Sequence, residues 1–264
     1  MADLVTRYGR WAVVAGASEG IGAAFSRALA DAGFDLVLIA RRAEPLEALA
    51  SELRGRGRTV EVHAFDLAAP DLEARFAALA TDREIGLVVY NAALSIIAPF
   101  LDTPLADKQR ILDVNTRGPL TAAHVLGGAM AARGRGALVL VSSLTAFWGS
   151  AWVATYGATK AFNLALGEAL AVELAPRGVD VVVTCAGATR TPGFAAATVG
   201  KKAPASMSPE EVARQTLRRL PGRGAFVPGG FNRFAQFLMQ RLMPRRTAVR
   251  LMANETRRLL ARSD

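Results

Sequence analysis

The stretch that decides the fold is Trp11-Ala-Val-Val-Ala-Gly-Ala-Ser-Glu-Gly-Ile-Gly22. An apolar run of strand length leads into three glycines, and a helical pattern follows over residues 20–32. Glycines at such a turn let the backbone amides of the helix N-terminus approach a pyrophosphate. The stretch therefore predicts a dinucleotide-binding turn formed by Gly16, Ser18, Glu19, Gly20, Ile21 and Gly22.

Strand and helix patterns alternate along the rest of the chain. Strand-length apolar runs cover residues 36–40, 59–64, 87–90, 137–142, 179–184 and, less clearly, 225–227. Helical patterns cover residues 45–54, 71–80, 105–133, 153–175 and 209–220. Central strands that are apolar on both faces indicate a parallel sheet covered on both sides. We therefore expect one α/β domain over residues 1–264, a Rossmann-type doubly wound fold with a mainly parallel seven-stranded sheet and helices on both faces.

The charge distribution argues against a nucleic-acid partner. The chain has a formal net charge of +9, and from Phe231 onward eight arginines face only Glu255 and Asp264. Arginine is also far commoner than lysine throughout, which indicates a compositional bias instead of a binding surface. No recognition helix or RNA-binding signature accompanies the arginines.

The remaining composition favours the cytoplasm. Cys185 is the single cysteine, so no internal disulfide is expected, and a buried apolar role is the simpler interpretation. The short, charged opening of the chain does not fit a signal peptide. Residues 136–159 are uncharged, but their serines, threonines and glycines predict a strand, a turn and a helix start instead of a membrane span.

A rival interpretation of the glycine turn is a hydrolase nucleophile elbow. Residues 16–20 match G-x-S-x-G, which also lies between a strand and a helix. That motif needs a later acid and then a histidine, whereas the two histidines are His63 and His124, the second inside a helical pattern. The nucleotide interpretation is therefore preferred.

Arg41 and Arg42 follow the second predicted strand, where dinucleotide folds often carry an acidic residue that selects NAD. A guanidinium binds a 2′-phosphate with paired hydrogen bonds, and no carboxylate stands there to repel it. The pair favours NADP(H) as the cofactor.

Tyr156 and Lys160 predict acid/base chemistry. Residues four apart lie on one face of a helix, so the ammonium is expected to lower the pKa of the phenol. Ser143 precedes this pair by thirteen residues and supplies a hydroxyl. A tyrosine adjusted in this way exchanges protons near neutral pH.

These motifs together resemble the short-chain dehydrogenase/reductase family over nearly the whole chain. The matches beyond the glycine turn are Asp66-Leu67 at the adenine, Asn91-Ala92-Ala93 after the fourth strand, Asn115, and residues 186–191 with Gly187, Thr189 and Thr191 beside the nicotinamide. Ala15, Ala93 and Ala186 depart from the family pattern of threonine, glycine and proline, which puts cofactor affinity more in doubt than the chemistry.

The resemblance assigns a role to each member of a tetrad. It implies that Tyr156 exchanges a proton with the substrate oxygen and that Ser143 stabilises that oxygen. It also implies that Lys160 binds the nicotinamide ribose and that Asn115 positions a water linking the lysine to solvent. No metal is required.

The substrate side is rich in aromatic residues, with Phe147, Trp148, Trp152 and Phe194 as candidate contacts. These residues suit a bulky lipophilic ketone or alcohol, although packing in a core or subunit contact is an equal alternative. The chain looks most similar to NADPH-dependent bacterial hydroxysteroid dehydrogenases, with 3-oxoacyl thioester reductases second and a non-catalytic NADP-binding regulator as a third hypothesis. Residues 188–207 are interpreted as a substrate lid.

Residues 231–264 form a predicted helical tail of mixed apolar residues and arginines. We expect it to cap the substrate site or join a homodimer or homotetramer interface. Contact with an anionic membrane is the less favoured alternative, because the apolar positions are interpreted as scattered around the helix.

Overall fold

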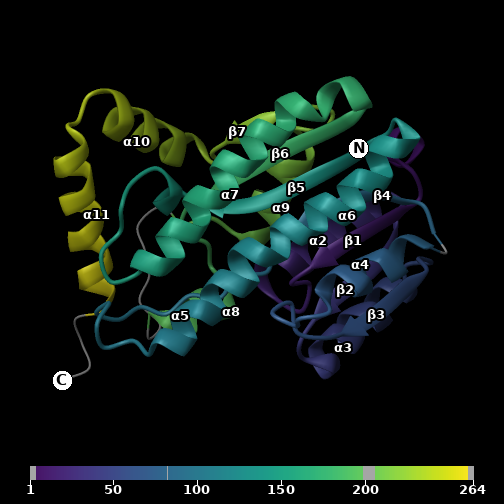
Figure 1. The fold of residues 1–264 in the computed structure, drawn as a ribbon, viewed down its shortest axis with the longest axis horizontal. Coiled ribbons are helices and arrows are strands. Elements are labelled where there is room, and N and C mark those ends of the chain that lie inside the picture. Colours follow the sequence, from purple (N-terminus) through teal and green to yellow (C-terminus); the bar gives the residue numbers. More distant parts are fainter. Residues whose placement is uncertain (1–3, 82, 199–205, 261–264) are drawn as a thin grey trace.

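The computed structural model describes residues 4–81, 83–198 and 206–260. Its single sheet has the strand order β3-β2-β1-β4-β5-β6-β7, and every neighbouring pair is parallel (Figure 1). The strands are β1 (Trp11–Ala15), β2 (Asp35–Ala40), β3 (Val60–Ala64), β4 (Ile85–Tyr90), β5 (Gly136–Ser143), β6 (Val179–Ala186) and β7 (Gly224–Phe226). The order reverses between β1 and β4, so their carboxyl ends open a crevice suited to a ligand. The predicted doubly wound fold is confirmed, with a fully parallel sheet.

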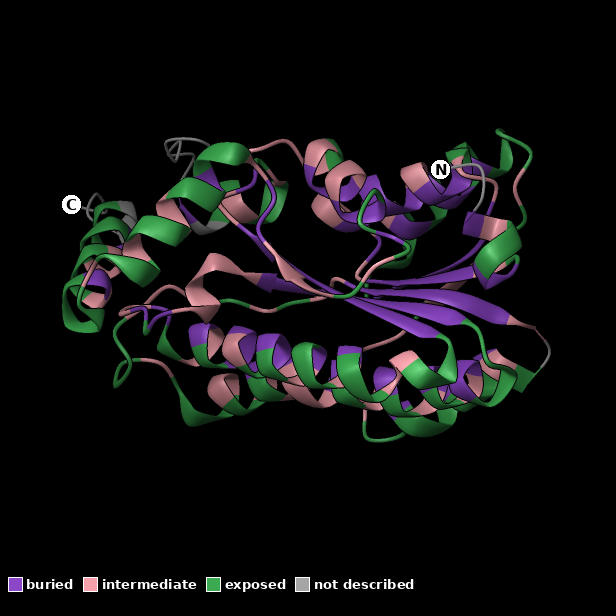
Figure 2. Ribbon diagram, turned by 90° about the horizontal axis from the view of Figure 1, so that it is seen from above, coloured by how far each residue is buried: buried purple, intermediate pink, exposed green. Residues whose placement is uncertain are grey.

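Helices cover both faces of the sheet (Figure 2). On one face lie α1 (Leu4–Tyr8), α2 (Gly20–Asp31), α3 (Ala43–Arg54) and α9 (Pro209–Leu217), and on the other lie α4 (Leu72–Thr81), α6 (Gly118–Arg133) and α7 (Ala154–Glu173). Alternate strand residues enter the two cores: Val14 packs on the first side and its neighbour Val13 on the second. Burial on both faces explains why the strands are apolar throughout.

The helix predicted over residues 105–133 is interrupted in the structure. Helix α5 (Leu105–Leu112) passes into a π-helical turn, η1 (Asp113–Arg117), before α6 begins. The Tyr90 hydroxyl donates to the carbonyl oxygen of Val114 at 2.8 Å, and the side chain of Asn115 bonds outside its own helix. Hydrogen bonds from other elements therefore accompany the wider turn, which is common at functional sites.

The C-terminal tail forms two helices, α10 (Gly230–Arg241) and α11 (Arg245–Leu260), beyond the ends of β5 and β6 (Figure 1). Three short elements complete the fold: η2 (Leu144–Ala146), η3 (Ala175–Arg177) and α8 (Pro192–Ala197). Among the described residues no helix combines the length and hydropathy needed to cross a bilayer.

Candidate active site

The glycine turn between β1 and α2 is packed too tightly for side chains. A Cβ on Gly16 would lie 2.6 Å from the Ala92 backbone, and one on Gly22 would lie 1.9 Å from the carbonyl oxygen of Gly16. Gly16 also has a φ of 82°, which favours glycine. The Asn91 amide donates to the Gly16 carbonyl at 3.0 Å and ties the turn to the end of β4.

The N-terminus of α2 remains available to an anion. Glu19 occupies the N-cap position with extended backbone, but its side chain makes no capping hydrogen bond. The first amides of a helix have no partners within the helix, and the helix dipole favours negative charge at this end. Together with the tight glycine turn that precedes it, this open helix N-terminus fits the pyrophosphate of a dinucleotide.

Arg41 and Arg42 are both exposed where β2 ends, beside the glycine turn. Arg42 pairs with Glu19 at 2.5 Å, and their side chains are 60% and 40% exposed. An exposed pair of this kind contributes little to stability, so the guanidinium can exchange its partner for a phosphate at small cost. Sequence reasoning identified both residues but not their pairing.

Asp66 and Leu67, expected at the adenine, have different environments. Burial acts to raise the pKa of Asp66, but hydrogen bonds from the Ala68 amide and Arg110, with the charge of Arg41, hold that pKa below its ordinary value. Asp66 is therefore an ionised acceptor at neutral pH. The Leu67 side chain packs in the hydrophobic core beneath the sheet.

Ser143, Tyr156 and Lys160 lie together where β5 ends and α7 begins. A hydrogen bond links the side chains of Tyr156 and Ser143, and the Lys160 ammonium lies 5.5 Å from the centroid of the Tyr156 ring. Lys160 is buried and donates to the Val141 carbonyl at 2.8 Å. An ammonium has three hydrogens, so this single acceptor leaves capacity for the hydroxyls of a ribose. The structure thus brings the predicted trio together.

The pKa directions correct one expectation. Burial raises the pKa of Tyr156, and its hydrogen bond to Ser143 only partly offsets this. Burial also lowers the pKa of Lys160, to about 8, with a smaller opposing effect from Cys185. In the polypeptide itself the expected lowering of the Tyr156 pKa by Lys160 is therefore wrong, because desolvation of both groups dominates.

Asn115 is fully buried and uses both donors of its amide. It donates to the Leu94 carbonyl at 2.9 Å and to the Thr159 hydroxyl at 3.0 Å, while its own oxygen accepts from the Leu94 amide. Thr159 in turn donates to the Tyr156 carbonyl at 2.7 Å. The sequence analysis did not identify Thr159. The one feature that could have marked it is its hydroxyl, directly before Lys160 in the sequence. The chain of bonds holds η1 against the first turn of α7.

The segment after β6 places the predicted nicotinamide contacts. Thr189 is buried and donates to the Gly187 carbonyl at 3.0 Å, whereas Thr191 accepts from the Phe194 amide at the start of α8. A Cβ on Gly187 would lie 2.7 Å from the amide nitrogen of Asn232, a buried residue of α10 that the sequence did not mark. The tail is therefore anchored beside this segment.

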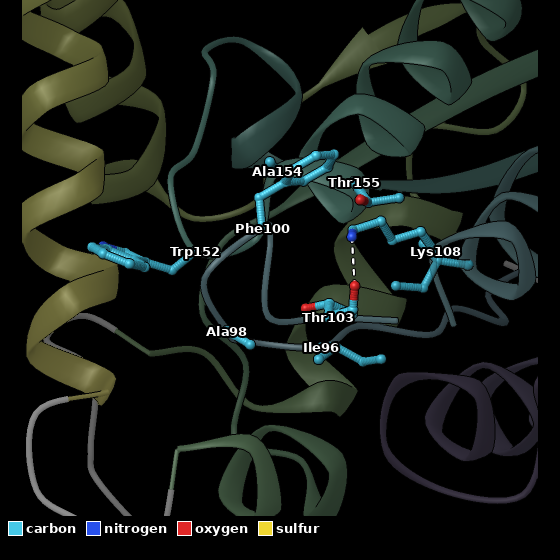
Figure 3. Close-up of a pocket in the computed structure, with 9 residues that line it drawn as sticks. Ile96, Ala98, Phe100, Thr103, Lys108, Trp152, Ala154 and Thr155 are labelled. Carbon is cyan, nitrogen blue, oxygen red and sulfur yellow. Dashed lines mark hydrogen bonds between the residues drawn. The ribbon is translucent and has the colours of Figure 1, made fainter. Parts of the chain in front are cut away.

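The predicted substrate aromatics fall into two groups. Trp148 is buried with its ring centroid 5.6 Å from that of Phe147, which packs against the end of the core. Trp152 lines a hollow with Ile96, Phe100 and Lys108. In Figure 3 its indole points away from the other labelled side chains, toward the yellow C-terminal helix. The Trp152 φ of 68° is unusual for a bulky residue and marks a loop held in a specific form.

Phe194 is partly buried on α8, within the segment predicted as a lid. The two ends of that segment pair, since the Met207 amide donates to the Ala188 carbonyl at 3.0 Å and the Arg190 amide donates to the Met207 carbonyl at 2.9 Å. Residues 199–205 of the predicted lid lie outside the described residues. No group of residues suited to a metal ion occurs in the described ranges.

Comparison with known proteins defines the family. The short chain dehydrogenase family model matches residues 10–201, and the chain belongs to this family. It is 36% identical over 193 residues to the 7beta-hydroxysteroid dehydrogenase of Collinsella aerofaciens, covering 73% of each protein.

Two solved structures are similar. That of a 7beta-hydroxysteroid dehydrogenase has a TM-score of 0.88 at 30% identity and covers 94% of this chain and 98% of its own. A short-chain dehydrogenase from Sphingobium yanoikuyae in complex with NADPH has a TM-score of 0.78 at 32% identity, covering 83% and 87%. The predicted family membership is confirmed.

Proposed function

We propose that this protein is an NADP(H)-dependent oxidoreductase that interconverts a ketone and a secondary alcohol on a bulky lipophilic substrate. The observation that carries the proposal is the half-buried Tyr156, bonded to Ser143 and flanked by the Lys160 ammonium, in a fold whose glycine turn is too tightly packed for side chains. A protein that only binds a nucleotide has no need for this geometry.

The cofactor assignment rests on fit at three places. The glycine turn and the open N-terminus of α2 suit the pyrophosphate, Arg41 and Arg42 suit a 2′-phosphate, and the spare hydrogens of Lys160 suit the nicotinamide ribose. A similar structure contains NADPH. When bound, this cofactor supplies or accepts a hydride.

The polypeptide supplies the proton. Because its pKa is raised, the Tyr156 phenol is protonated at neutral pH, which suits proton donation to a carbonyl oxygen as the ketone is reduced. The Ser143 hydroxyl lies beside the phenol and stabilises the negative charge that develops on the same oxygen. The hydrogen bonds from Asn115 to Thr159 and from Thr159 to the Tyr156 carbonyl hold the first turn of α7 in place.

The proposed substrate is a ketosteroid or hydroxysteroid. Support comes from the 7beta-hydroxysteroid dehydrogenases among the similar proteins. The aromatic residues Phe100 and Trp152 add to it, and the hollow that they line, about 10 Å³ in volume, must widen to admit such a substrate. Aromatic and aliphatic linings favour large apolar ligands. The lid role of residues 188–207 remains a prediction.

Initial rates of NADPH oxidation test the substrate class. A panel should contain steroid ketones, 7-oxosteroids first, together with 3-oxoacyl thioesters and small polar aldehydes. We expect kcat/KM to be highest for a steroid ketone. Preference for the thioesters would support the second candidate, a 3-oxoacyl reductase, and activity on small polar substrates alone would refute the lipophilic assignment. NADPH binding without turnover of any member would favour the regulator hypothesis.

We also propose that the protein assembles as a homodimer or homotetramer in the cytoplasm. The faces of α6 and α7 that point away from the sheet share a hollow lined by Leu112, Leu120 and Phe162, which are 45%, 46% and 37% exposed. An exposed apolar patch of this kind is typical of an interface. Light scattering of wild type and Phe162→Arg tests this, with loss of the oligomer expected for the variant.

A further inference from the structure

Helix α10 turns its largest side chains outward. Phe231, Phe234 and Phe237 are 65%, 63% and 56% exposed, and Leu242 just beyond the helix is 71% exposed. The side that faces the protein instead carries the buried Asn232. Exposing three phenylalanines on twelve residues costs free energy unless another phase or partner covers them.

These side chains form one stripe. At about 100° per residue, Phe231, Phe234, Phe237, Leu238 and Leu242 fall within an arc of roughly 140°. Gln236 and Gln240 lie outside the arc. The expectation that the apolar residues of the tail are scattered around the helix is therefore wrong for α10. The scattering was the reason for disfavouring contact with a membrane, so that reason no longer applies to α10.

Cations accompany the stripe: on the same wheel Arg241 falls within the arc and Arg233 beside it, and further arginines follow on α11. Residues 230–260 carry seven arginines and one acidic residue, Glu255, which pairs with Arg258. Arg233, Arg241, Arg246 and Arg250 are exposed and have no acidic partner among the described residues. Guanidinium groups around an apolar face are the pattern of a helix that lies in the plane of an anionic membrane.

A second copy of the chain is the competing occupant. Pairing α10 with its symmetry mate would bring Arg233 and Arg241 of both copies together, and like charges across an interface are repulsive. An anionic lipid surface instead offers negative headgroups to the arginines and an apolar region in which the phenylalanines are removed from water. The α6–α7 hollow has no comparable excess of unpaired cations and suits a protein partner better.

We infer that α10 is a peripheral membrane-docking helix, which inserts the Phe231, Phe234 and Phe237 stripe into the interface of a bilayer containing anionic lipid. No membrane-crossing helix is needed, and none is found among the described residues. The docking depends on the exposed stripe and its charges, so it stands independently of the proposed activity.

The docked helix would also bring the bilayer near the substrate aromatics. Arg245 donates to the Phe147 carbonyl at 3.2 Å, and Val249 of α11 faces Gly149. Helix α11, which follows α10, therefore adjoins the loop that carries Trp152 (Figures 1 and 3). If the proposed function holds, a lipophilic substrate would reach this loop from the membrane.

Flotation of the full chain with lipid vesicles tests the inference. We expect recovery with vesicles of mixed phosphatidylglycerol and phosphatidylcholine, and at least about tenfold less with phosphatidylcholine alone. The triple change Phe231→Ser, Phe234→Ser and Phe237→Ser should lower the bound fraction about tenfold. Replacing Arg233, Arg241, Arg246 and Arg250 by glutamine should lower it to a similar extent and remove its dependence on salt.

A matched control is the double change Leu101→Ser and Val172→Ser, which removes side chains 89% and 75% exposed elsewhere and should float like wild type. Thermal melting and NADPH binding confirm that each variant folds. Wild type that stays unbound with anionic vesicles, or a triple variant that floats equally well, would overturn the inference. So would an oligomer that is lost in the triple variant without any flotation of wild type, because the stripe would then belong to a second copy.

Discussion

The Lys160 ammonium lies 5.5 Å from the centroid of the Tyr156 ring; Lys160 is buried and Tyr156 is half-buried. Desolvation changes the two pKa values in opposite directions: it raises the pKa of the Tyr156 phenol and lowers that of Lys160 to about 8. At neutral pH both groups are therefore protonated. In the proposed function they act as two separate donors, Tyr156 to the substrate oxygen and Lys160 to the nicotinamide ribose.

Lys160 should make cofactor affinity depend on pH. As the pH rises through about 8, the ammonium loses its proton and with it a charge-assisted hydrogen bond to the ribose. We expect the NADPH dissociation constant to rise by roughly threefold to tenfold between about pH 7 and about pH 9.5, measured by NADPH fluorescence. Lys160→Met should bind more weakly at both values and lose this dependence, and an unchanged slope in the variant would count against the assignment.

Arg42 should contribute to cofactor selection. Arg42→Asp places a carboxylate where a 2′-phosphate is proposed, next to Glu19, and should raise the KM for NADPH by at least about tenfold while changing that for NADH much less. Arg177→Asp, an exposed change on η3, is the charge-matched control. An equal rise in the KM for NADPH and for NADH would show that Arg42 does not bind the 2′-phosphate.

Thr159 should act as a positioning residue. Thr159→Val keeps the shape but removes one of the two acceptors of the Asn115 amide and the side-chain donor to the Tyr156 carbonyl, at a cost of about 1–3 kcal/mol in unfolding free energy. We expect kcat to fall about tenfold with NADPH binding retained. Thr159→Ser restores the hydroxyl and should recover kcat. Failure of this rescue, with the variant folded, would limit Thr159 to packing.

Trp152 should separate large from small substrates. Trp152→Ala removes the indole of a residue that lines the hollow with Phe100, so the KM for a steroid ketone should rise about tenfold while that for a small aldehyde changes little. Steady-state kinetics on the two substrates measure the ratio. Equal losses for both would mean that Trp152 supports the loop fold, given its positive φ, and does not contact substrate.

The sheet was predictable from sequence because its signal is local. The strands β1, β2, β4, β5 and β6 are buried on both faces, so their apolar runs appear directly in the chain, and the observed bounds of all seven strands differ from the predicted ones by at most two residues. The trio Ser143, Tyr156 and Lys160 was predictable for a related reason, because a strand end and one helix turn set its spacing.

The remainder depends on contacts between distant residues. The π-turn at Asn115 accompanies bonds to Leu94 and Thr159, which are 21 and 44 residues away, and no local pattern predicts these. Burial by the whole fold likewise decides the pKa of Tyr156. The stripe on α10 has a period visible in the sequence, but only tertiary packing shows that it faces outward.

The most direct test is the rate of NADPH oxidation with a 7-oxosteroid by wild type and Tyr156→Phe, with NADPH binding measured alongside. Our account predicts that wild type turns over, that the variant loses roughly a hundredfold to ten-thousandfold in kcat, and that its NADPH affinity is nearly unchanged. A variant that retains wild-type turnover would contradict the assignment of Tyr156 as the proton donor, and with it the proposed chemistry.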